Sequence, residues 1–174
     1  MGPLDLFPVA QSVLSASVDA INSVQIADPT LLGVPARSYV SPGVPAFDDC
    51  EQLTVHVNAI LESSGPRAVP LGRTAMTGRL NLVQFIIHIT RCLPMGEAGE
   101  PPSATDLQAV ARQIDADGWA LWNHVYNLVR SKQLFAFCKE VFFDGERAII
   151  PEGGYGGWRF ELRAQIDGYG EGGT

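Results

Sequence analysis

The sequence predicts an α+β fold in which a mainly antiparallel β-sheet packs against α-helices. Three observations predict this class. The stretch Arg79–Cys92 is rich in β-branched and aromatic residues and has no internal Gly or Pro. Two alternating segments, Glu51–Glu62 and Gly157–Asp167, match it as sheet partners. A helical stripe from Thr105 to Lys132 supplies an apolar surface to cover the sheet.

Arg79–Cys92 is expected to be a long strand in the interior of the sheet. Its odd-numbered positions from Val83 to Ile89 are all apolar, whereas its even-numbered positions include Gln84 and His88. One face should therefore meet the core while the other is half-buried. The regular alternation in Glu51–Glu62 likewise predicts a half-buried strand.

The N-terminal part predicts one helix and a long connection. Pro3–Gln25 carries apolar residues at helical spacing, so we expect an amphipathic helix, with a start after Pro8 as one alternative. Ala27–Asp49 contains four prolines and two glycines, which exclude a helix and leave room for a short extended piece at Arg37–Val40.

The second half of the chain predicts the remaining elements. Ser103 or Thr105 can cap the long helix, and Gly118 marks either a kink or a close approach to the sheet. The Asp144-Gly145 pair is a hairpin signal, which predicts two short strands at Phe137–Phe143 and Arg147–Ile150. At 174 residues the chain fits a single domain: an N-terminal helix (1–26), a connection (27–49), an α/β core (50–167) and a flexible tail (168–174).

Composition narrows the function classes. A net charge of −7 argues against a nucleic-acid-binding module, which would gather Lys and Arg on one face. The three cysteines, Cys50, Cys92 and Cys138, lie far apart without CxxC spacing, so we expect reduced, small buried hydrophobic residues rather than a disulfide framework or a zinc site. The sequence shows neither a basic leader nor an apolar membrane span, so the expected product is soluble and intracellular.

Few residue patterns suggest a catalytic or metal-binding site. His56 and His88 fall on strands expected to be neighbours, but without close-spaced ligands they are interpreted as ordinary half-buried histidines. Cys92 or Cys138 with His88 or His124 has the residue types of a nucleophile pair, yet nothing in the sequence would lower the thiol pKa. No catalytic residue, metal site or cofactor is predicted.

Two further patterns are weighed against plainer interpretations. The glycine-rich segment Glu152–Gly157 lacks the Lys-Ser/Thr pair and the helix of a phosphate loop, so a hairpin turn is expected. Asp115 and Asp117 should point to different sides of the long helix. Trp119 and Trp122 on that helix suggest an aromatic anchor, although Trp122 lies on the core stripe.

Four segments together resemble one protein family. They are Cys-Glu-Gln-Leu (Cys50–Leu53), Thr-Arg-Cys-Leu-Pro (Thr90–Pro94), Asp-Gly-Trp-Ala-Leu-Trp (Asp117–Trp122) and Gly-Gly-Tyr-Gly-Gly-Trp (Gly153–Trp158). Over residues 48–167 the chain resembles the tail-terminator (tail-completion) proteins of long-tailed actinobacterial phages. The resemblance implies a small α/β subunit that forms a hexameric ring, caps the tail tube and joins it to the head-proximal neck.

The resemblance also implies the partners: the tail tube protein, the head–tail stopper, and phage DNA that crosses the lumen without specific binding. The subunit would not be an enzyme or a membrane protein, and would belong to the virion after assembly in the host cytoplasm. We expect contacts at Arg67 and Arg73, in a loop (Ser63–Gly78) longer than a hairpin needs, and at Trp119 and Tyr155. The alternatives are another neck component, such as a stopper or adaptor, and a small enzyme with an atypical pocket.

Overall fold

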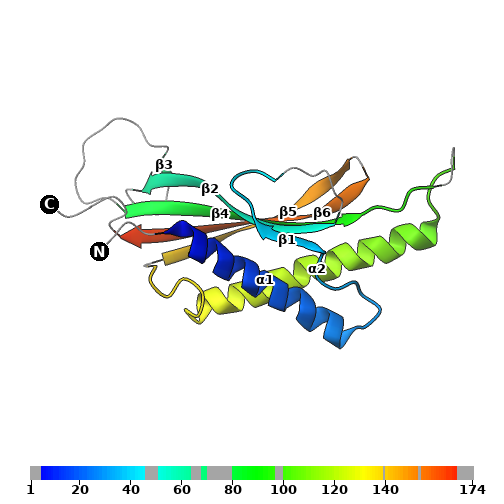
Figure 1. Cartoon of the computed structure of the whole chain (residues 1–174), viewed down its shortest axis with the longest axis horizontal. Coiled ribbons are helices and arrows are strands. Elements are labelled where there is room, and N and C mark those ends of the chain that lie inside the picture. The colour runs from blue at the N-terminus through cyan, green and yellow to red at the C-terminus, as the bar shows by residue number, and fades with distance from the viewer. Residues whose placement is uncertain are drawn as a thin grey trace.

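The structure is a computed structural model and describes residues 5–45, 51–63, 68–69, 80–96, 100–138, 140–152 and 154–167. Its elements are α1 (Leu6–Ala27), β1 (Arg37–Val40), β2 (Gln52–Ser63), β3 (Ala68–Val69), β4 (Leu80–Cys92), α2 (Ala104–Arg130), β5 (Glu140–Glu152) and β6 (Tyr155–Asp167). The strands form one mostly antiparallel sheet, and both helices lie on the same side of it (Figure 1). The predicted α+β class is confirmed.

The strand order is β1-β2-β4-β6-β5, with β3 paired to the far end of β2. As predicted, β4 lies in the interior between β2 and β6, and both pairings are antiparallel. Ile87, for example, lies opposite Val55 on one side and Phe160 on the other. The short extended piece Arg37–Val40 was also expected, and it pairs parallel with the start of β2. Strands β1 and β5 therefore end this path at its two edges.

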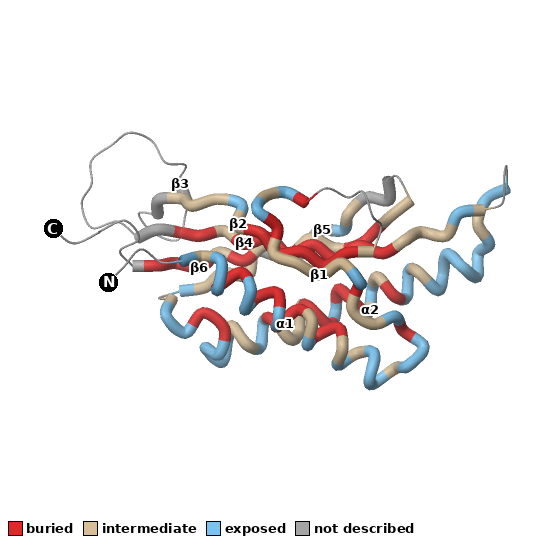
Figure 2. The backbone as a smooth tube through the Cα atoms, in the orientation of Figure 1, coloured by how far each residue is buried: buried red, intermediate tan, exposed pale blue. Residues whose placement is uncertain are grey.

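The core lies between the sheet and the two helices, where Figure 2 shows the buried parts of both layers facing each other. The sequence predicted that the long helix covers the sheet, but α1 covers a large part of the sheet as well. Three small residues, Ala10, Ala16 and Ala20, are buried along α1 and let its backbone approach the neighbouring layer closely. The fully buried sheet residues on this side include Leu53, Val55, Phe85, Ile87, Phe160, Leu162 and Ala164.

Helix α1 begins earlier than the alternative start after Pro8. Asp5 is its N-cap, and the Asp5 carboxylate accepts a hydrogen bond of 3.0 Å from the Phe7 N–H. Pro8 is accommodated at the third helical position because N–H groups in the first turn have no intrahelical acceptor. The helix therefore starts at Leu6.

Helix α2 is capped by Ser103, as predicted, and continues unbroken past Gly118. Gly118 permits a close approach: a Cβ at this position would lie 2.5 Å from Trp158 Nε1 on β6. The Trp158 indole N–H uses that space to donate a hydrogen bond of 2.9 Å to the Ile114 carbonyl oxygen. Of the two expectations for Gly118, close approach is the one observed.

The prediction of two short strands around Asp144-Gly145 is wrong. The Asp144-Gly145 pair does not turn the chain; it falls within one strand, at a register shift between Phe143 and Glu146. Strand β6 pairs with β5 on both sides of this shift, so the long partner overrides the local turn signal and the irregularity is absorbed as a bulge. The chain turns instead after Glu152, where Gly154 has a φ of +85°, and this turn was predicted.

Candidate assembly interface

Helix α2 carries an aromatic stripe, defined here as Trp119, Trp122 and Tyr126. Their spacing along the helix places them on one side of it. Trp122 stacks on Tyr126, with ring centroids 6.0 Å apart, and meets Phe143 of β5 edge-on at 4.7 Å. Trp122 is thus anchored against the core, whereas 68% of Trp119 is exposed. An exposed Trp held beside a fixed aromatic pair has the chemistry of an interface anchor.

A hollow of about 260 Å³ lies beside the stripe, between the C-terminal turns of α2 and strand β5. We call it the aromatic hollow; its lining residues are Tyr126, Val129, Arg130, Lys132, Phe135, Cys138, Val141 and Phe143. Its floor is apolar, and its two charged residues, Arg130 and Lys132, are cations. No acidic residue occurs between positions 118 and 138, so this surface has a basic rim in an otherwise acidic chain.

The backbone after α2 gives the aromatic hollow its shape. Gln133 N–H donates to the Leu128 carbonyl at 3.0 Å and Lys132 N–H donates to the Val129 carbonyl at 3.1 Å, which closes the helix in a Schellman pattern. This pattern needs a left-handed residue, and Lys132 takes that place with φ 57°. Phe135 is also left-handed, with φ 62°. Non-glycine residues adopt this conformation only when their surroundings hold them in it.

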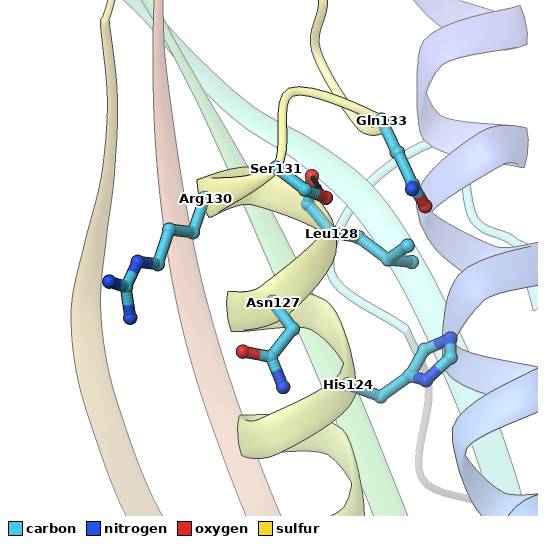
Figure 3. A pocket seen from close by; sticks show the side chains of 6 residues that line it. All are labelled: His124, Asn127, Leu128, Arg130, Ser131 and Gln133. Atoms are coloured by element: carbon cyan, nitrogen blue, oxygen red, sulfur yellow. Dashed lines mark hydrogen bonds between the residues drawn. The ribbon is translucent and has the colours of Figure 1, made fainter.

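A second hollow, of about 550 Å³, lies at the C-terminal end of α2 on the α1 side. In Figure 3, His124, Leu128 and Gln133 point toward α1, whereas Arg130 points away from it. The lining is completed by Asn127 and Ser131, so it holds one imidazole and no carboxylate. These side chains do not converge on a common point, which gives no support to the alternative of an enzyme pocket here.

The sheet face away from the helices carries a buried polar cluster. His56 and His88 stack with ring centroids 5.5 Å apart, and Thr54 and Thr90 are fully buried near them. The histidines were expected to be half-buried, but both are buried, so β2 and β4 are covered on both faces at this point. Within the described part of the chain, the Thr54 and Thr90 hydroxyls and Nδ1 of His56 have no hydrogen-bond partner.

Both histidines are held in the neutral form. Burial is the main cause that lowers the pKa of His88 to about 4, and electrostatic interactions with His56 and Arg159 contribute to the same shift. Burial, and then Arg159, lowers the pKa of His56 as well. Among the described residues no three His, Cys, Asp or Glu side chains are grouped so that they could hold a metal ion.

One of the cysteines differs from the prediction. Cys92 is disulfide-bonded, so the expectation of three reduced cysteines is wrong for this residue, because strand pairing brings distant positions together without leaving a local spacing signal. Cys138 carries a free thiol, and burial raises its pKa to about 12. A thiol pKa raised in this way opposes the thiolate that a nucleophile pair requires. The third cysteine, Cys50, lies outside the described residues.

Of the four residues predicted to form the interface, the structure describes Trp119 and Tyr155. Trp119 is exposed on α2, seven residues before Tyr126, which lines the aromatic hollow. Tyr155 is half-buried at the start of β6, nine residues along that strand from Ala164, which faces the hollow residue Val141. Nine residues of strand span roughly 30 Å. Arg67 and Arg73 lie outside the described residues, as does most of the loop that contains them.

The sequence does not predict the aromatic hollow, because Cys138 and Val141 fall in the expected strand Phe137–Phe143, Phe135 precedes it, and no pattern relates them to the long helix. The aromatic content of residues 134–150 was the available signal. Neither described helix is long and apolar enough to cross a membrane. Comparison with models of known protein families found no match, and comparison with curated proteins found no relative.

Proposed function

We propose that the protein is a structural virion subunit that forms a ring, terminates the tail tube of a long-tailed phage and joins it to the head-proximal neck. The proposal starts from the sequence resemblance over residues 48–167 and agrees with the α+β fold. The observation that carries it furthest is Trp119, which is 68% exposed on the same side of α2 as Tyr126, a residue that lines the aromatic hollow. Large exposed aromatic residues of this kind are typical of contact sites between proteins.

The sheet supplies a second argument for a subunit of a ring. The strand path ends in two unlike edges, β1 and β5, and the helices cover one face only. A molecule with different surfaces at its two edges suits heterologous contacts, in which one surface meets a different surface on the next copy. Such contacts generate a closed ring when the rotation between copies closes.

The negative net charge of the chain is compatible with a ring through which DNA must pass. Six copies of a subunit at −7 give a ring with a formal charge of −42 before its partners bind. A basic lining of the ring would bind the DNA duplex, whereas a neutral or acidic lining lets the duplex pass. In this proposal the lumen is neutral or acidic, and Arg67 and Arg73 contact partner proteins. The purified protein should then show no measurable duplex binding at physiological salt.

The experiment that tests the function is gene disruption in the phage. Loss of the protein should leave heads and tail tubes in the lysate without joining them, and the protein supplied from a plasmid should restore infectious particles. Normal virions from the disrupted phage would contradict the proposal. A plasmid that carries a frameshifted gene is the matched control.

A further inference from the structure

We propose that neighbouring copies of this chain contact each other asymmetrically, with Phe7 and Asp5 at the start of α1 in one copy docking into the aromatic hollow of the next copy. The contact is argued from the described residues alone. Its repetition into a ring rests on the proposed function.

The aromatic hollow is suited to one apolar side chain. Its volume of about 260 Å³ lies below the ~300–1,000 Å³ typical of pockets for small-molecule ligands. Phe135, Val141 and Phe143 give it an apolar floor. Arg130 and Lys132 at the rim favour a guest that carries a negative charge beside its apolar group.

The N-terminal end of α1 carries such a combination of an apolar side chain and a negative charge. Phe7 is 60% exposed although it is a large aromatic residue in a helix. Asp5, the exposed N-cap, lies two residues away and is held by its hydrogen bond to the Phe7 N–H. The aromatic ring and the carboxylate are therefore presented together on one helix start.

The charges of the two surfaces are complementary. Residues 5–36 contain three acidic residues and no Lys or Arg, whereas residues 118–138 contain two cations and no Asp or Glu. Within the first stretch, Asp28 already pairs with Arg112, which leaves Asp5 and Asp19 exposed on the surface. Opposite charges on separate surfaces of one chain favour a second copy as the occupant of the hollow.

A copy does not fill its own hollow with Phe7. Helix α1 packs along one side of α2, where Gln11 and Ser15 share a groove with Leu128, while the aromatic hollow lies on the other side of α2 against β5. In the described part of the chain, α1 packs mainly on α2, β1 and β2, whereas β5 packs on β6 and α2. The contact is therefore heterologous and can be repeated from copy to copy.

Cys138 in the hollow allows a direct test. The variant Phe7→Cys should form an intermolecular disulfide with Cys138 of the next copy when copper–phenanthroline oxidises tails isolated from phage that carry the variant. The expected result is a ladder of covalent oligomers on a non-reducing gel. The ladder should disappear in Phe7→Cys combined with Cys138→Ser, and Ile26→Cys, 81% exposed at the other end of α1, should give none.

A charge swap adds a second readout. Arg130→Glu with Lys132→Glu should reduce the yield of assembled tails at least tenfold, and adding Asp5→Lys should recover most of the loss. Particles with six copies of the protein but neither cross-link nor rescue would overturn the contact while leaving the proposed function intact. Cross-linked ladders of the purified Phe7→Cys protein, together with virions that lack the protein, would support the contact and contradict the function. Cross-linked dimers alone would also overturn the asymmetric contact.

Discussion

The guanidinium of Arg91 and the carboxylate of Asp117 form a buried bidentate pair, with Nε 2.7 Å from Oδ2 and Nη2 3.1 Å from Oδ1. The two side chains are only 2% and 3% exposed. Arg91 also donates to the Gly33 carbonyl at 2.8 Å, and Gln113 donates to Asp117 at 2.9 Å. The pair thus joins β4, α2 and the connection after α1.

Removing one partner of this pair should be strongly destabilising. Arg91→Met leaves the Asp117 carboxylate buried without its cation, and we expect a loss of about 3–5 kcal/mol in the free energy of unfolding, measured by urea titration. The double variant Arg91→Met with Asp117→Leu should recover part of that loss. Arg112→Ala, which removes an exposed ion pair with Asp28, is the control and should unfold near the parent midpoint. Equal midpoints for Arg91→Met and Arg112→Ala would show that the buried pair has been misjudged.

Gly118→Ala should destabilise the protein although Ala is the better helix former. The added Cβ would fall 2.5 Å from Trp158 Nε1, so the indole must move and give up its hydrogen bond to Ile114. We expect a loss of about 1–3 kcal/mol, as for other overpacked sites, measured by thermal unfolding. In a Trp158→Leu background the same change should cost much less. An unaltered melting temperature for the single variant would contradict the close approach of α2 to β6.

The stacked histidines predict a loss of stability in acid. The folded-state pKa of His88, about 4, lies below its ordinary value of 6.5, so the unfolded chain binds more protons between these pH values. Stability should therefore fall as the pH drops from 6.5 toward 4, by on the order of 3 kcal/mol from this residue. His88→Gln should flatten the dependence over that window relative to the parent. The same pH dependence in parent and variant would rule out His88 as its source.

Reduction should weaken the fold through Cys92. Dithiothreitol is expected to lower the free energy of unfolding by about 2–4 kcal/mol, the usual contribution of a native disulfide. Cys92→Ser should be equally unstable with and without the reductant. Thiol counting under denaturing, non-reducing conditions provides the check: one reactive thiol, that of Cys138, is expected in the parent, and three would contradict the disulfide.

The sequence predicted the parts of the fold that a repeating pattern specifies. The alternation around Phe85 and Ile87 sufficed to place β4 in the interior, since each of its faces needs a cover. The bulge after Phe143 was not predictable, because Asp144-Gly145 has the same local preference in a hairpin and in a bulge, and only pairing with β6 decides between them.

The candidate interface was predictable only in part. Trp119 was identifiable because it lies off the core stripe of its helix. The aromatic hollow was not, because it depends on the left-handed Lys132 and Phe135, which are residue types that rarely signal such a backbone. The Arg91–Asp117 pair is separated by 26 residues and arises only from the packing of α2 on the sheet.

The most direct test of the proposed function is an averaged electron-microscopy image of the head-proximal end of tails isolated from infected cells, with this protein tagged for identification. The expected image is a closed ring of six copies at the junction between tube and neck. The tag at the opposite tip of the tail, or a ring built from dimers related by two-fold axes, would contradict it.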